Sequence, residues 1–105
     1  MHTLSAIELN QKFLNGELKA EAIIQHFLSR IETLDPVIKA FLSVFKEKAL
    51  ATARSQDERL ARGEKLGRLA GVPVAIKDNI HVQGEITTCA SQFLRNYKAP
   101  FDSTA

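Results

Sequence analysis

The sequence predicts an α/β fold in which helices come first and strands follow. Apolar residues recur between residues 20 and 31 at i, i+3, i+4, i+7, i+8 and i+11, which is the spacing of one helix face. Ala, Leu, Glu, Lys and Arg, which favour helices, dominate residues 46–62. The β-branched, apolar residues 69–80 then indicate a strand. We therefore expect one domain or a piece of one, mainly helical over residues 1–66 and with its first strands over residues 67–105.

Composition excludes several classes of protein. The 105 residues carry 14 basic and 12 acidic side chains, a net charge of +2, so the clustered basic face of a dedicated nucleic-acid-binding domain is not expected. A single cysteine excludes an internal disulfide. No run approaches the 18 apolar residues of a membrane span, and the first residues lack the apolar core of a signal peptide. We expect a soluble, cytoplasmic chain that contacts no membrane.

Local signals set the limits of the first two helices. Ser5 and Glu8 have the spacing of a capping box, in which each side chain binds the backbone amide of the other residue. Gly16 is placed to end this helix in a left-handed conformation. The helix that begins near residue 20 is expected to close at Asp35 and Pro36, because proline lacks an amide donor and disfavours helical geometry in the preceding residue.

The segments that follow alternate between expected strand and helix. The short apolar run within residues 38–45 contains Val and Phe and predicts a buried strand. Residues 46–62 predict a helix that Gly63 ends. We interpret its charged residues as a solvated helix face rather than a binding surface.

Turn signals dominate the last quarter of the chain. Gly84 interrupts residues 81–88 and indicates a turn or hairpin. A short helix is expected over residues 90–96, and Asp102 has the position of an N-cap for a further helix.

Lys77 is the strongest candidate for chemistry. Three apolar residues precede it, so the predicted strand would end on a cation. Burial lowers the pKa of a lysine, and a neutral amine can act as a general base. The alternative is a lysine whose aliphatic stem packs on the strand end while its ammonium group reaches water.

Other candidates are weaker. His2, His26 and His81 have no metal-ligand spacing, so no metal site is expected. Cys89 has no companion cysteine and suits a buried small apolar side chain better than a nucleophile. The hydroxyl-rich residues 87–91 either line a pocket or cap the helix expected after them.

Two blocks of the chain resemble a known family. Gly71, Pro73, Lys77, Asp78 and Asn79 match the GxPxxxKDN block of the amidase signature family, whose lysine is the terminal base of a Ser–cis-Ser–Lys triad. Residues 87–91, Thr-Thr-Cys-Ala-Ser, and residues 96–104 resemble one branch, the A subunits of the aspartyl/glutamyl-tRNA amidotransferases. Many other members carry Thr-Thr-Ala-Gly-Ser at the first of these two blocks. The resemblance extends over essentially the whole chain.

The resemblance implies a fold and an activity. The fold would be a larger mixed-sheet amidase domain, of which this chain is the N-terminal part. The subunit would hydrolyse glutamine, and B and C subunits would complete a heterotrimer that amidates Glu-tRNA(Gln) or Asp-tRNA(Asn). A partner subunit would bind the mischarged tRNA, and the complex would use ATP and Mg²⁺, while this chain would bind no cofactor. Lys77 would be the catalytic base, and Thr88, Cys89, Ala90 and Ser91 would line the substrate pocket.

The triad serines have no counterpart here. In the family they lie in a Gly/Ser-rich segment, and Ser91 and Ser103 have no such surroundings. We therefore expect residues 1–105 alone to be inactive. Two alternatives stay open: part of a stand-alone amidase that acts on small amides, or a non-catalytic interaction module whose amphipathic helices dock on a partner.

Overall fold

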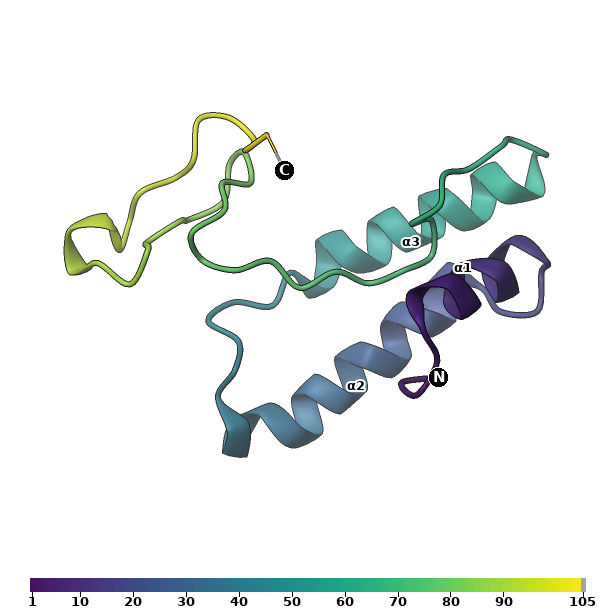
Figure 1. Ribbon diagram of the computed structural model, residues 1–105, viewed down its shortest axis with the longest axis horizontal. Coiled ribbons are helices and arrows are strands. Elements are labelled where there is room, and N and C mark those ends of the chain that lie inside the picture. The colour runs from purple at the N-terminus through teal and green to yellow at the C-terminus, as the bar shows by residue number, and fades with distance from the viewer. Residues whose placement is uncertain (105) are drawn as a thin grey trace. The chain divides into compact units, whose positions relative to one another are not determined.

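The α-helices lie in the first part of the chain. A computed structural model describes residues 1–104, in which the helices are α1 (Ala6–Leu14), α2 (Ala20–Ile38), α3 (Lys46–Ala61) and the single 3₁₀ turn η1 (Gln92–Leu94) (Figure 1). The chain divides into two compact units, Met1–Pro73 and Val74–Ala105, which are described separately here. Among the described residues, no helix is long and apolar enough to cross a membrane.

The predicted limits of α1 are confirmed. The Glu8 amide donates to Ser5 Oγ at 3.2 Å and the Ser5 amide donates to Glu8 Oε2 at 2.6 Å, which completes the capping box. These bonds, the one from the Ser5 amide first, hold the pKa of the Glu8 carboxyl below its usual range. The helix ends at the C-cap Asn15, and Gly16 follows with a φ of 79°.

The apolar stripe predicted for α2 is confirmed, but the predicted end is wrong. Ala20, Ile23 and Leu28 are buried along the stripe. The helix continues through Pro36 to Ile38 and closes when the Lys39 amide, at a φ of 58°, donates to the Asp35 carbonyl. Proline removes one amide donor from the helix, but the amide of Lys39 still donates to the carbonyl of Asp35 at 2.6 Å and closes the last turn.

The buried strand predicted over residues 38–45 is not confirmed. Residues 39–45 form an exposed connection between α2 and α3. Asp35 Oδ1 accepts the amides of Ala40 and Phe41 at 2.7 and 3.3 Å, so these two donors are bound locally and are not free for a strand partner.

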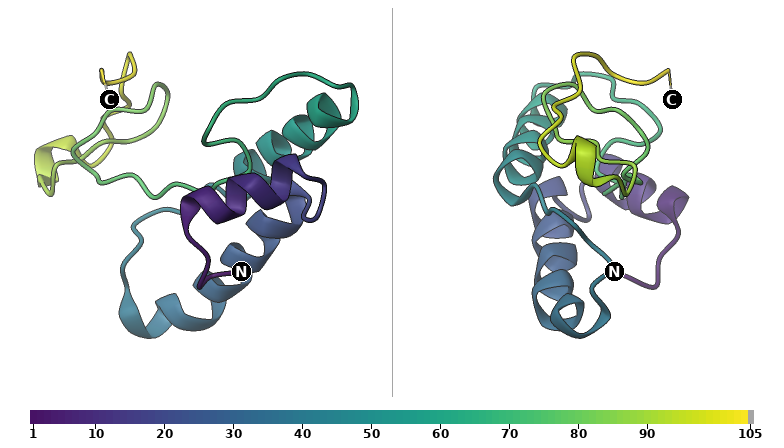
Figure 2. Two further views of the ribbon diagram at one scale, coloured as in Figure 1. Left: turned by 45° about the vertical axis from the view of Figure 1, so that its right-hand side comes forward. Right: turned by 90° about the vertical axis from the view of Figure 1, so that its left-hand side faces the viewer.

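Helices α2 and α3 lie side by side and antiparallel (Figures 1 and 2). The α2 N-cap, Lys19, makes no capping bond with its own side chain. Instead, Asp57 of α3 accepts the amides of Ala20 at 2.7 Å and Glu21 at 3.1 Å. A carboxylate from the neighbouring helix therefore caps α2 and complements the positive end of its dipole.

The core of the first unit lies where α1, α2, α3 and the loop after α3 meet. Buried apolar side chains from all four segments form it: Leu9, Phe13, Ala20, Ile23, Ala53 and Ala70. Asn10 of α1, also buried, donates to the carbonyls of Gly67 at 3.2 Å and Ala70 at 2.8 Å. Gln56 Oε1 of α3 accepts the Gly71 amide at 2.8 Å. These bonds attach the loop to two helices.

Gly71 is required where the loop reaches the core. Its φ is 77°, and a Cβ built on it would lie 2.7 Å from Cγ of Phe13, whose side chain is fully buried. Only glycine combines this left-handed backbone with so close an approach to the ring.

The strand predicted over residues 69–80 is not confirmed either. Residues 67–71 form hydrogen-bonded turns, and residues 72–77 form neither helix nor strand. Residues 1–104 contain no sheet, and the single β-bridge among them joins Ile86 and Lys98. A strand is stable only when a neighbour pairs its amides and carbonyls, and the predicted mixed sheet is therefore absent from the described chain.

Removing the carboxylate that caps α2 should destabilise the first unit. We expect Asp57→Ala to cost about 1–2 kcal/mol, because the amides of Ala20 and Glu21 lose their acceptor, and Asp57→Asn to cost less, because one carbonyl oxygen remains. Urea unfolding followed by circular dichroism measures the difference. The exposed neighbour Glu58→Ala is the control and should stay within about 0.5 kcal/mol of the parent. Equal stability of Asp57→Ala and the parent would contradict this capping role.

A methyl group at residue 71 should not be accommodated. We expect Gly71→Ala to cost about 3 kcal/mol or more, from overlap with Phe13 together with a left-handed alanine. Gly67→Ala is the matched control in the same loop, because its Cβ would meet nothing within 4 Å. The two midpoints of thermal unfolding should differ widely, and similar midpoints would disprove the close approach.

Candidate active site

The candidate residues lie in the second unit, around a short antiparallel pairing. Backbone hydrogen bonds of 2.8–3.0 Å connect residues 84–87 with residues 97–99. Gly84 has a φ of 82° in the turn that begins this pairing, and Thr87 is 2% exposed. The turn predicted over residues 81–88 is confirmed, whereas a hairpin within these residues is not, because residues 84–87 pair with residues 97–99.

Lys77 lies at the start of a turn. Its carbonyl accepts the Ile80 amide at 3.0 Å, and its side chain is exposed. The buried strand end that was expected to desolvate the amine is not formed by residues 1–104. The catalytic role of Lys77 stays a prediction, based on the motif around it.

Asp78 connects the Lys77 turn with the segment expected to line the pocket. Asp78 Oδ1 accepts the Thr88 amide at 2.9 Å, and Oδ2 accepts the Thr88 hydroxyl. The Asp78 carbonyl also accepts the Cys89 amide at 3.0 Å. The Thr88 hydroxyl and then its amide hold the pKa of the Asp78 carboxyl below its usual range.

The expected pocket-lining residues form a turn with an uncommon backbone. Cys89 and Ala90 have φ values of 49° and 61°, and the Ser91 amide closes the turn on the Thr88 carbonyl at 2.8 Å. A left-handed residue other than glycine costs about 1–2 kcal/mol. Ser91 precedes η1 but makes no capping bond with its side chain, so the interpretation of this segment as a helix cap is not confirmed.

Cys89 and the end of the chain differ from expectation. The Cys89 thiol is free and exposed, so it is not the buried apolar side chain that the sequence indicated. η1 spans three residues within the helix expected over residues 90–96.

The Asp102 carboxylate accepts the Gln83 amide at 2.8 Å and so closes a loop. The helix expected after Asp102 would include residue 105, which lies outside the described residues.

The three histidines form no common cluster. In the first unit His2 and His26 stack, with their rings parallel to within 10° and Nδ1 of His2 3.3 Å from Nε2 of His26. In the second unit His81 contacts the rings of Tyr97 and Phe101. Over residues 1–104 no three His, Cys, Asp or Glu side chains are grouped so that they could hold a metal ion.

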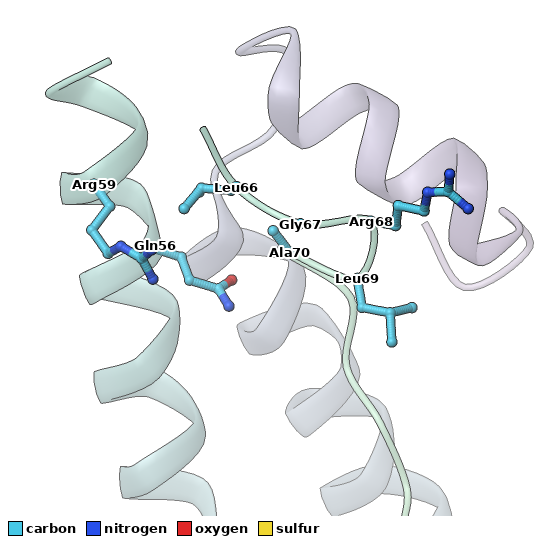
Figure 3. Close-up of a pocket in the computed structure, with 7 residues that line it drawn as sticks. All are labelled: Gln56, Arg59, Leu66, Gly67, Arg68, Leu69 and Ala70. Carbon is cyan, nitrogen blue, oxygen red and sulfur yellow. The ribbon is translucent and has the colours of Figure 1, made fainter. Parts of the chain in front are cut away.

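A hollow of about 520 Å³ lies in the first unit, whereas the predicted site residues belong to the second (Figure 3). Gln56 and Arg59 of α3 line one side and the loop after α3 lines the other; the full lining is Gln56, Arg59, Leu66, Gly67, Arg68, Leu69 and Ala70. This lining has two cations but no nucleophile, acid or neutral base. It offers no acid–base or nucleophilic chemistry.

Sequence reasoning missed Asp78 as a structural partner of Thr88. The two residues are ten positions apart and belong to no helical or strand periodicity that would predict contact. The only available signal was that both lie in blocks that carry the family resemblance.

The chain belongs to the amidase signature family. The family model described as Amidase matches residues 22–105. The solved structure of a bacterial aryl acylamidase from the amidase signature enzymes has the same fold, with a TM-score of 0.86 over 91% of this chain and 20% of that chain at 24% identity. A structure described as an unexpected vestigial protein complex that reveals the origins of an s-triazine catabolic enzyme is 31% identical, with a TM-score of 0.88 over 95% of this chain and 22% of that chain.

Within the family, the chain is similar to A subunits of glutamyl-tRNA(Gln) amidotransferase. It is 55% identical to the subunit of Chlamydia felis (strain Fe/C-56) and 48% identical to that of Protochlamydia amoebophila (strain UWE25), each over 104 residues. These alignments cover 99% of this chain and 21% of each relative. The chain thus spans about a fifth of the length of these curated relatives.

Acid should release the Asp78 carboxylate from Thr88. The pKa of Asp78 is lower in the folded chain than in the unfolded chain, where it is about 3.9. The two hydrogen bonds therefore stabilise the folded chain at pH values above about 3.9, and this stabilisation is lost as the pH falls through the pKa of the folded chain. We expect the Thr88 amide resonance to titrate with Asp78 below about pH 4. Thr88→Val should raise the pH at the midpoint of this titration, because the hydroxyl donor is lost. Asp78→Asn is the control and should abolish the titration. An unchanged midpoint in Thr88→Val would contradict the hydrogen bond between the Thr88 hydroxyl and Asp78.

Proposed function

We propose that the chain is the N-terminal part of the A subunit of a tRNA-dependent amidotransferase, in which it contributes to the hydrolysis of glutamine. The observation that carries this proposal is the identity of 48–55% with glutamyl-tRNA(Gln) amidotransferase A subunits over 104 of the 105 residues. The more distant solved structures support the family but not this substrate.

In this proposal Lys77 is the terminal base. A serine attacks the glutamine carboxamide, and its proton passes through a second serine to the amine of Lys77. The C–N bond then breaks, ammonia leaves with a proton returned along the same path, and water later hydrolyses the acyl-enzyme. A serine hydroxyl is a weak nucleophile, so it needs a base within reach. Thr88, Cys89, Ala90 and Ser91 line the glutamine pocket. The chain alone supplies one of the three triad residues and is therefore inactive by itself.

The remaining steps belong to the assembled enzyme. Ammonia released from glutamine amidates Glu-tRNA(Gln) on a partner subunit, which also binds the tRNA. The B and C subunits complete a cytoplasmic heterotrimer, and the complex consumes ATP with Mg²⁺. We assign no cofactor to residues 1–105.

A stand-alone amidase for small amides is the second candidate. The solved structure that is 31% identical, with a TM-score of 0.88, does not favour it, because that structure is described as a protein complex. The two candidates differ in one assay. When the complete subunit is mixed with glutamine, B and C subunits, ATP and mischarged tRNA, amidated tRNA forms only if the protein is an amidotransferase. A stand-alone amidase hydrolyses small amides without any partner.

Truncation of Lys77 should abolish glutamine hydrolysis. In the complete subunit we expect Lys77→Ala to lower kcat by about 10²–10⁴-fold, the usual contribution of a general base. The fold should change little, because the side chain is exposed. Ammonia release measures the activity, and circular dichroism measures the fold.

Lys98→Ala is the matched control, since Lys98 is also an exposed lysine of the second unit. It should keep the parental rate. Near-normal glutamine turnover by Lys77→Ala would overturn the assignment of Lys77 as the base.

A further inference from the structure

The turn formed by residues 88–91 has a backbone that its sequence does not favour. Its two central residues, Cys89 and Ala90, both have positive φ, and the Ser91 amide donates to the Thr88 carbonyl at 2.8 Å. This geometry is that of a type I′ turn, whose central positions favour glycine, asparagine and aspartate. Neither Cys nor Ala relieves the crowding of its own Cβ. The turn therefore needs interactions from outside to keep its shape.

Asp78 supplies these interactions. Its carboxylate accepts both the amide and the hydroxyl of Thr88, and its carbonyl accepts the Cys89 amide. Three hydrogen bonds from two consecutive residues thus end on one residue. Hydrogen bonds to an ionised acceptor are stronger than those between neutral groups.

The segment that leads into the turn is also attached. Thr87 is buried, and its amide donates to the Tyr97 carbonyl at 3.0 Å, within the antiparallel pairing. The turn is therefore held by the pairing before Thr88 and by Asp78 at Thr88 and Cys89. Lys77 shares a peptide bond with Asp78, so the same contacts fix the backbone from which the lysine projects.

We propose that Asp78 is a positioning residue, which holds the left-handed Cys89–Ala90 turn and the backbone of Lys77 in one fixed arrangement. The inference rests on the proposed function, because only in an amidase does the arrangement of Lys77 and this turn affect a rate. Asp78 acts through its neighbours and has no contact with the reacting atoms in this proposal.

An electrostatic role is the alternative for Asp78. A carboxylate next to a lysine in sequence would favour the charged amine and so change the pH at which the base works. Both carboxylate oxygens, however, accept hydrogen bonds from Thr88. If Asp78 acts by holding the turn, a substitution that stabilises the turn should compensate for the loss of the carboxylate. If Asp78 acts through its charge, the same substitution should not compensate.

A double-mutant cycle separates the two roles. Ala90→Gly removes the crowded Cβ from the left-handed position, so the turn should keep its shape with less support. In the 105-residue chain we expect Asp78→Asn to accelerate amide hydrogen exchange at Thr88, Cys89 and Ser91 about 10-fold or more. The acceleration should be clearly smaller when Ala90→Gly is also present.

Asp102→Asn is the matched control for this measurement. Asp102 is another carboxylate of the second unit that accepts a backbone amide, that of Gln83. It should leave the exchange of the three turn amides unchanged. Parental exchange rates in Asp78→Asn, or an equal acceleration with and without Ala90→Gly, would overturn the inference.

Activity in the complete subunit provides the second readout. We expect Asp78→Asn to lower kcat for glutamine hydrolysis about 10-fold or more with little change in KM, and Ala90→Gly to restore part of the loss. The pH dependence of kcat should keep its midpoint, whereas a charge role would shift it. A parental kcat in Asp78→Asn, a shifted midpoint or no rescue by Ala90→Gly would overturn the inference.

The two proposals fail separately. An active Lys77→Ala variant would remove the proposed function while the exchange measurements still decide whether Asp78 holds the turn. An inactive Lys77→Ala variant together with a fully active Asp78→Asn variant would leave the proposed function intact and remove only the positioning role.

Discussion

The helical unit depends on the contact between the ring of Phe13 and the backbone of Gly71. The buried ring reaches a residue without a side chain, and this lets the loop after α3 pass directly over the core. Asn10 and Gln56 bind the polar backbone groups of the same loop, so its entry into an apolar region leaves them hydrogen-bonded. Ala70 then completes the core, and the first unit ends three residues later, at Pro73.

The parts of the fold that were predictable are those that neighbouring residues decide. Ser5, Gly16 and Gly63 mark helix ends through bonds and φ values that depend on a few adjacent residues, and the structure has these ends. The apolar stripe of α2 follows from helical spacing alone. The end of this helix was misjudged because Pro36 removes only its own amide donor, while the amide of Lys39 still finds the carbonyl of Asp35.

Interactions between distant residues were not predictable. The two expected strands had suitable composition, but a strand forms only with a partner, and composition carries no information about partners. The motif identified Lys77 and the segment after Thr87 as the candidate site. It did not indicate that Asp78 and Thr88 would bind each other, or that Ala90 would adopt a left-handed backbone, since alanine has no preference for that conformation.

The capping of α2 by α3 also bears on the order in which the unit folds. Asp57 lies 37 positions after Ala20 in the sequence, so the amide of Ala20 lacks this carboxylate acceptor until α3 has formed beside α2. Helix nucleation is unfavourable without such support, and the two helices should therefore form in one cooperative step. The same carboxylate fixes their register, because a slip of one turn, about 5.4 Å, would separate it from both amides.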